Sequence, residues 1–175
     1  EAFETYKKLK ATHASLDTID IGGGFAVPYE KKRMYSAETV IRRLLKKAKE
    51  LSENAGIPHV NIIVEWGRYI AAPAQLSVFK VVTSKAIPKG VAKEWYIIDG
   101  SFMNDLLDTW ALHQKWHIIP VNNMNAAKKH RVWLAGLSCD SDDKYTASDG
   151  YLLLPRLEDL TPGDDQYIAI LDTGA

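Results

Sequence analysis

The chain has 175 residues, and its 46% hydrophobic content is enough to build a sizeable core in one or two domains. Lysine plus arginine and aspartate plus glutamate each number 22, so the balanced charge argues against a nucleic-acid partner or an anionic membrane. The apolar runs are too short to cross a bilayer. Cys139 is the only cysteine, which rules out an internal disulfide and favours a reducing, cytoplasmic location.

The first part of the chain alternates between helix and strand patterns. Residues 1–13 place apolar side chains at helical spacing, and the short apolar run of residues 16–21 predicts a buried strand. Ser36 can cap a second helix, and Gly56 can end it. Residues 60–64 predict the next buried strand. The apolar stripe of the second helix consists of Val40, Ile41, Leu44, Leu45, Ala48 and Leu51.

This order of strand, helix and strand predicts a βαβ unit with parallel strands and a right-handed crossover. Ligands of such folds gather at the carboxyl ends of the strands. Residues 22–24 and residues 65–68 each follow a predicted strand directly. We therefore expect these two loops to be neighbours in space and to face a common pocket.

The pattern changes after residue 74 and becomes rich in strands. One helix is predicted within it, over residues 101–110. The predicted strands cover residues 75–87, 94–99, 116–121, 131–137 and 166–172. The expected fold class is therefore α/β plus β, in which part of a barrel, residues 1–74, precedes a β-domain, residues 75–175.

Gly22, Gly23 and Gly24 follow the first predicted strand without interruption. Because glycine has no Cβ, such a turn can adopt positive φ angles and let a ligand approach the backbone closely. Its amides can then point at an anion, usually a phosphate. The alternative is a tight strand-to-helix turn with no ligand. The basic residues 31–33 in the following loop are expected to face solvent.

Three short motifs follow one another along the chain: G-G-G-F at residues 22–25, E-W-G-R at residues 65–68 and C-D-S-D at residues 139–142. This order resembles the pyridoxal phosphate-dependent decarboxylases with an alanine-racemase-like barrel, which act on ornithine, diaminopimelate or arginine. Residues 163–175 also resemble a strand near the end of that family's β-domain. The resemblance implies the carboxyl-terminal part of a (β/α)8 barrel and then an incomplete β-domain. It also implies a longer protein whose amino-terminal half carries the lysine that binds the cofactor.

The resemblance assigns cofactor contacts to both glycine loops. Residues 22–24, with Gly67 and Arg68, would hold the phosphate of pyridoxal 5'-phosphate. Glu65 would lie beside the pyridine nitrogen and favour its protonated form, which makes the ring a better electron sink. The local alternatives are a surface salt bridge for Arg68 and a solvent-facing strand end for Glu65. Trp66 departs from the family, which commonly has proline at this position.

The same resemblance assigns Cys139 and Asp140 to the active site of the other subunit. Cys139 would return a proton to the α-carbon after decarboxylation, and Asp140 would attract the distal cationic group of the substrate. Each site would then borrow residues from its partner, so a homodimer is expected. The alternative for a lone cysteine is an inert residue of the core.

The substrate is less tightly specified. Ser101 and Phe102, followed by D-T-W-A-L-H-Q at residues 108–114, look like a pattern of biosynthetic arginine decarboxylases, which would place the protein in polyamine metabolism as a producer of agmatine. Residues 103–106 instead look like a diaminopimelate decarboxylase segment. Asp108 would face a substrate guanidinium, or would simply be a carboxylate at a helix end.

Two function classes stay open at this point. One is a decarboxylase acting on arginine, diaminopimelate or ornithine, of which this chain alone is expected to be inactive. The other is a non-catalytic relative similar to antizyme inhibitors, which keeps the fold without the chemistry. The five histidines show no metal-binding spacing, although His113 and His117 could share a helix face, so no metal site is expected.

Overall fold

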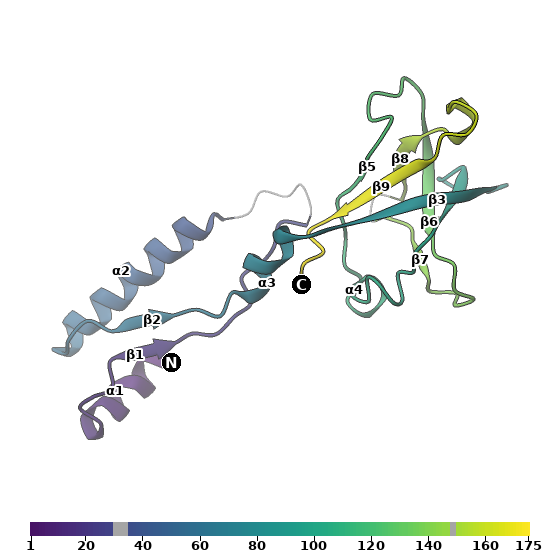
Figure 1. Cartoon of the computed structure of the whole chain (residues 1–175). Helices are drawn as coiled ribbons and strands as arrows, with labels where there is room; N and C mark the ends of the chain where they lie inside the picture. Colours follow the sequence, from purple (N-terminus) through teal and green to yellow (C-terminus); the bar gives the residue numbers. More distant parts are fainter. Residues whose placement is uncertain (30–34, 148–149) are drawn as a thin grey trace. The chain divides into compact units, whose positions relative to one another are not determined.

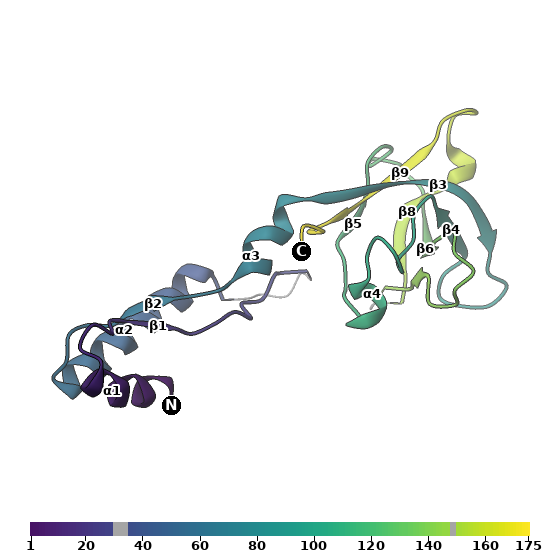
Figure 2. The same ribbon diagram turned by 60° about the horizontal axis from the view of Figure 1, so that its bottom comes forward.

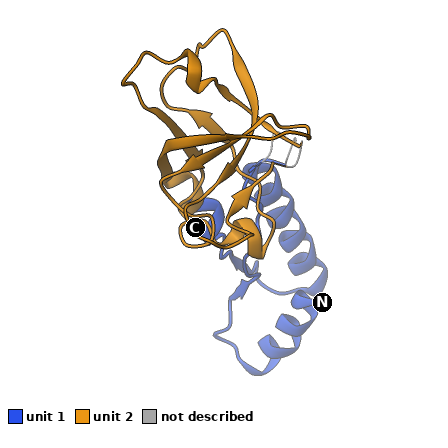
Figure 3. Cartoon of the chain, turned by 90° about the vertical axis from the view of Figure 1, so that its right-hand side faces the viewer, with its two compact units in different colours: residues 1–70 blue, residues 71–175 orange. Residues whose placement is uncertain are grey.

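The computed structural model describes residues 1–29, 35–147 and 150–175 of a mixed α/β chain (Figure 1). It divides into two compact units, residues 1–70 and residues 71–175, which Figure 3 colours separately. The basic residues 31–33 lie outside the described residues.

Unit 1, residues 1–70, contains the predicted βαβ arrangement. Helix α1 (Ala2–Thr12) leads into strand β1 (Thr18–Asp20), and helix α2 (Ala37–Ala55) connects β1 to strand β2 (Asn61–Ile63). The two strands pair in parallel, with Ile19 opposite Ile62. The parallel crossover predicted from the sequence is thus confirmed, although both strands are shorter than the apolar runs that predicted them.

Helix α2 begins and ends at the predicted residues. The Thr39 amide donates to the Ser36 hydroxyl at 3.2 Å, and Gly56 adopts the left-handed conformation with φ 64°. Ala48 packs on Phe3, Tyr6 and Val60 in the core of unit 1. The predicted apolar stripe is not covered along its whole length, because Leu45 of the same helix is exposed.

Unit 2, residues 71–175, is built around one curled sheet (Figure 1, Figure 2). Among the described residues the sheet has seven strands, in the order β5-β9-β3-β4-β6-β7, and β8 pairs with β6. The strands are β3 (Leu76–Ala86), β4 (Glu94–Ile98), β5 (Ile118–Pro120), β6 (Lys129–Ala135), β7 (Lys144–Tyr145), β8 (Leu152–Pro155) and β9 (Gln166–Leu171). Unit 2 also contains the short helices η1 (Ala72–Ala74), α4 (Asp108–Ala111) and η2 (Leu157–Asp159), whereas helix α3 (Gly67–Ala71) spans the boundary between the units in the sequence.

One pair of strands in unit 2 runs in parallel, whereas the other paired strands are antiparallel. Strand β4 pairs in parallel with β6, and Tyr96 lies opposite Leu134. Tyr96 and Leu134 are fully buried, so the two strands contribute directly to the core. This parallel pairing brings the carboxyl ends of β4 and β6 to the same edge of the sheet.

The helix predicted over residues 101–110 is wrong for most of its length, because only Asp108–Ala111 is α-helical. The Ser101 hydroxyl accepts hydrogen bonds from the amides of Met103 at 3.1 Å and Asn104 at 3.3 Å. The Ser101 amide in turn donates to the Asp105 carboxylate at 2.8 Å. Short polar side chains can satisfy nearby amides in this way, which favours a turn over a helix.

Candidate cofactor and substrate site

The two glycine loops of unit 1 are neighbours, as the sequence predicts. Residues 22–24 follow β1 and residues 65–68 follow β2, at the same end of the parallel pair. The Glu65 amide donates to the Gly22 carbonyl at 2.9 Å. A Cβ on Gly23 would lie 2.8 Å from the Glu65 carbonyl oxygen, closer than real Cβ atoms come. The absence of a side chain at Gly23 is therefore what allows the two loops to touch.

Positive φ angles and local hydrogen bonds define the conformation of the two glycine loops. Gly22 and Gly24 have φ angles of 74° and 86°, which side chains other than glycine rarely adopt. The Gly22 amide donates to the Asp20 carboxylate at 2.8 Å, and in the second loop the Gly67 amide donates to the Glu65 carbonyl at 2.8 Å. Glu65 and Arg68 are exposed, so both charged side chains remain accessible at the strand ends.

Three aromatic side chains join the two loops. The rings of Phe25 and Trp66 stack with their centroids 4.3 Å apart and an interplanar angle of 20°. Tyr69 meets Phe25 edge to face at 4.7 Å. Trp66 is only 9% exposed. We did not predict this cluster from the sequence, although an aromatic residue in each glycine loop was a visible signal.

A second pair of loops lies in unit 2, at the carboxyl ends of β4 and β6. Residues 99–102 follow β4, and residues 136–143 follow β6. The Leu137 amide donates to the Gly100 carbonyl at 3.2 Å. Cys139 and Asp140 lie in the second of these loops and are both exposed. Cys139 is therefore not a residue of the core.

Asp143 connects these two loops, and sequence analysis did not single it out. It is 3% exposed, and its carboxylate accepts hydrogen bonds from the amides of Phe102 at 2.7 Å and Ser138 at 3.1 Å. Gly136 lies so close to that carboxylate that a Cβ would overlap it. The signal available in the sequence was a further aspartate directly after C-D-S-D.

Hydrogen bonding decides the charge state of Asp143. Burial raises the pKa of this carboxyl, but hydrogen bonds from Ser138, Phe102 and Ser101 favour the charged form. Their combined effect holds the pKa of Asp143 below its ordinary value. Asp143 is therefore a charged anchor at neutral pH, and the loop that carries Cys139 is fixed to it.

Asp140 takes part in the internal structure of its loop. Its carboxylate accepts from the Asp142 amide at 2.8 Å, and its own amide donates to the Ser138 hydroxyl at 3.3 Å. Such a turn leaves carboxylate lone pairs available, since an ionised carboxylate has about four acceptor sites. An incoming cation can therefore still be met by Asp140.

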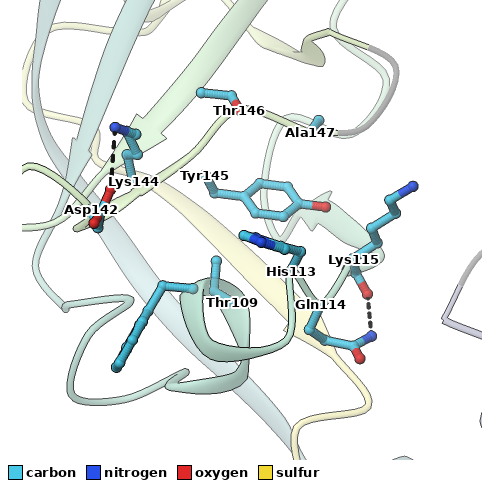
Figure 4. Close-up of a pocket in the computed structure, with 10 residues that line it drawn as sticks. Thr109, His113, Gln114, Lys115, Asp142, Lys144, Tyr145, Thr146 and Ala147 are labelled. Atoms are coloured by element: carbon cyan, nitrogen blue, oxygen red, sulfur yellow. Dashed lines mark hydrogen bonds and ion pairs between the residues drawn. The ribbon is translucent and has the colours of Figure 1, made fainter.

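A cavity of about 350 Å³ lies between the segment after α4 and strand β7 (Figure 4). Its lining residues are Thr109, Trp110, His113, Gln114, Lys115, Asp142, Lys144, Tyr145, Thr146 and Ala147. The cavity thus brings the D-T-W-A-L-H-Q segment next to Asp142 of the C-D-S-D motif. Of the predicted site residues, Asp108 starts α4 beside this lining, and Cys139 and Asp140 precede Asp142 in the neighbouring loop.

The two histidines suggested to share a helix face do not do so. Helix α4 ends at Ala111, and His113 has a φ angle of 52°. Across residues 1–29, 35–147 and 150–175 no group of three or more potential metal ligands comes together. In the same part of the chain, no helix is long and apolar enough to cross a membrane.

Comparison with known proteins identifies the unit that holds the glycine loops. Residues 1–72 match the family model described as pyridoxal-dependent decarboxylase, pyridoxal binding domain. The chain belongs to the pyridoxal-dependent decarboxylase family. The cofactor of this family is pyridoxal phosphate, and the glycine loops lie within the matched residues.

Relatives of two specificities resemble this chain. It is 28% identical over 132 residues to a biosynthetic arginine decarboxylase of Bacteroides thetaiotaomicron. This alignment covers 67% of the chain and 21% of that protein. It is 31% identical over 171 residues to a diaminopimelate decarboxylase of Aquifex aeolicus. This alignment covers 97% of the chain and 36% of that protein. The chain therefore spans about a fifth to two fifths of the length of these curated relatives.

The fold agrees with that of a solved relative. The crystal structure of the biosynthetic arginine decarboxylase from Campylobacter jejuni superimposes with a TM-score of 0.86 and 16% sequence identity. The match covers 98% of this chain and 43% of the other. At this identity the similarity establishes the shared fold and leaves the substrate open.

Proposed function

We propose that the complete protein containing this chain is a pyridoxal phosphate-dependent decarboxylase of a basic amino acid. The observation that carries this proposal is the contact between the two glycine loops at the carboxyl ends of β1 and β2, within the matched pyridoxal binding domain. A phosphate needs several backbone amides and a cation at one place. We assign this role to the loops that contain residues 22–24, Gly67 and Arg68, in which the amides of Gly22 and Gly67 donate to Asp20 and Glu65 in the absence of a phosphate.

The remaining roles follow the chemistry of the exposed side chains. The cofactor, when bound, supplies the electron sink for the negative charge left as carbon dioxide departs. Glu65 holds a proton on the pyridine nitrogen of the cofactor, because a carboxylate favours the protonated form of an adjacent base. The Cys139 thiol gives a proton to the α-carbon, and a free thiol fits a reducing, cytoplasmic location.

We assign residues 1–74 to the carboxyl-terminal part of a (β/α)8 barrel and residues 75–175 to a β-domain. Two compact units, 1–70 and 71–175, support a division in this region. Ile63 on β2 is 51% exposed, although parallel strands are ordinarily covered on both faces. Further barrel strands and helices would provide that cover.

Arginine is our first choice of substrate, with agmatine as the product in polyamine metabolism. The cavity beside α4 supports this choice, because it joins the D-T-W-A-L-H-Q segment to the C-D-S-D loop. Asp140 and Asp108 would meet the guanidinium. Diaminopimelate is the second candidate, because a relative of that specificity aligns with almost the whole chain. We further propose a homodimer in which Cys139 and Asp140 serve the active site of the partner.

The test is carbon dioxide release by the purified complete protein, loaded with pyridoxal phosphate and given arginine, diaminopimelate or ornithine in separate reactions. We expect arginine to be consumed fastest and agmatine to form in equal amount. Faster turnover of diaminopimelate would overturn the substrate choice and keep the reaction class. No turnover of any of the three by a protein that binds the cofactor would favour a non-catalytic relative.

A further inference from the structure

We propose that the stacked pair of Phe25 and Trp66 acts as a positioning device that sets the affinity of the protein for the phosphate of its cofactor. This inference rests on the proposed function, because it concerns the same phosphate-binding loops. Its subject is Trp66, the aromatic residue between Glu65 and Gly67 in the second loop.

The glycine loops have few side chains with which to hold one another. Residues 22–24 have none, and the backbone hydrogen bond from the Glu65 amide to the Gly22 carbonyl joins the loops directly. Phe25 follows the last glycine of the first loop, and Trp66 lies within the second loop. Their rings stack at 4.3 Å, so each loop is attached to the other at a second point.

The surroundings of Trp66 indicate that its ring serves packing. Glu65, Gly67 and Arg68 are all exposed, whereas Trp66 is 9% exposed. Tyr69 lies at right angles to both rings, with centroids 4.7 Å from Phe25 and 6.3 Å from Trp66. The Trp66 carbonyl accepts from the Ile70 amide at 3.2 Å, so the backbone on the far side of the ring is fixed as well.

The stack can therefore order both loops before a ligand arrives. Glycine backbones lose more conformational freedom on ordering than other residues do. If the loops are already ordered in the free protein, binding of a phosphate does not have to bear that cost. The pair of aromatic rings therefore limits the conformations that the two loops can adopt.

The effect should be specific for the phosphate group, which gives a direct test. Complete apoprotein is titrated with pyridoxal 5'-phosphate and, separately, with pyridoxal, and cofactor absorbance reports binding. Trp66→Ala should weaken binding of pyridoxal 5'-phosphate about tenfold, or about 1.4 kcal/mol, and change binding of pyridoxal less than about twofold. Trp66→Phe keeps an aromatic ring and should recover most of the loss.

Three further variants keep the test decisive. Phe25→Leu preserves apolar bulk while removing the ring partner, so it should show the same selective loss and remain informative if Trp66→Ala fails to fold. The double variant should lose less than the sum of the two single losses, because both remove one contact. Tyr35→Ala is the matched control, because Tyr35 is an aromatic residue of the same unit that is 69% exposed.

The outcomes separate this inference from the proposed function. If Trp66→Ala and Phe25→Leu weaken the binding of pyridoxal 5'-phosphate and of pyridoxal equally, the rings support the whole unit and the inference is wrong. Unchanged phosphate affinity in both folded variants would also overturn it. A wild-type protein that binds pyridoxal as tightly as pyridoxal 5'-phosphate would instead contradict the phosphate loops of the proposed function.

Discussion

The buried carboxylate of Asp143 accepts a 2.7 Å hydrogen bond from the amide of Phe102, a residue 41 positions earlier in the chain. This bond joins the loops that follow the parallel strands β4 and β6. Phe102 is fully buried, so the bond lies at the boundary between the core and the exposed loop that carries Cys139.

Asp143→Asn should therefore destabilise the protein by about 2 kcal/mol, because hydrogen bonds to a charged acceptor are worth about 1.5–3 kcal/mol and an amide nitrogen cannot accept. Urea unfolding of the complete protein measures this loss. Asp142→Asn is the control, since the Asp142 side chain is 64% exposed and its change should stay within about 0.5 kcal/mol. Equal losses from the two substitutions would contradict the anchoring role of Asp143.

The same carboxyl predicts a dependence of stability on pH. The folded state holds the pKa of Asp143 below its ordinary value, so the unfolded chain takes up this proton first as the pH falls. The contribution of Asp143 is therefore fully present above about pH 4, the ordinary range of aspartate, and is lost as the pH falls through the folded pKa. The difference in unfolding free energy between wild type and Asp143→Asn should shrink below pH 4. A difference that stays constant into acid would count against this assignment.

Gly23→Ala should force the two glycine loops apart. The added methyl group would meet the Glu65 carbonyl oxygen, a backbone atom that cannot swing away. We expect a loss of about 1–3 kcal/mol in the unfolding free energy of the apoprotein. Gly67→Ala provides the comparison, because nothing lies within 4 Å of a Cβ at that position. Similar stability of the two variants would show that the loops do not need their close contact.

Glu65→Gln should lower the turnover of the cofactor-loaded complete protein much more than it weakens cofactor binding. A neutral amide favours the protonated pyridine nitrogen less than a carboxylate does, whereas the phosphate loops are unchanged. A loss of about 3 kcal/mol in transition-state stabilisation corresponds to a rate reduction on the order of a hundredfold. Single-turnover rates and cofactor titration together measure the split. Wild-type turnover with full cofactor occupancy would refute the role of Glu65.

Shared active sites predict complementation between two inactive subunits. One subunit carries Cys139→Ala, and the other lacks the lysine that binds the cofactor in the rest of the protein. A mixed dimer would contain one site with both an intact lysine and an intact Cys139, so part of the activity should return. Subunit exchange is checked by distinct affinity tags. If exchanged dimers stay inactive, each site uses the Cys139 of its own subunit or does not use it.

The parts of the fold that could be predicted are those that depend on neighbours in sequence. The cap residue Ser36 and the terminal residue Gly56 mark the two ends of helix α2 in the sequence. The parallel pairing of β1 with β2 follows from the helical crossover between them. The contact between the glycine loops follows from the same topology. Local patterns suffice for these features because the βαβ unit permits few arrangements.

The features that could not be predicted depend on contacts between distant residues. Strand β7 has two residues and exists because it pairs with β6, and β8 likewise pairs with β6. Residues 101–110 have apolar side chains at helical spacing, yet the hydroxyl of Ser101 competes for the amides of Met103 and Asn104. Asp143 is one of 22 acidic residues, and only the fold reveals that Phe102 and Ser138 surround it.

The link through Asp143 also limits how this protein can be re-engineered. The loops after β4 and β6 are separate in sequence, but one carboxylate uses amides from both of them. Grafting either loop alone from a relative would leave that carboxylate short of donors, and Gly136 leaves no space into which it could shift. The smallest segment that can be transplanted intact therefore carries both loops, from Asp99 after β4 to Asp143.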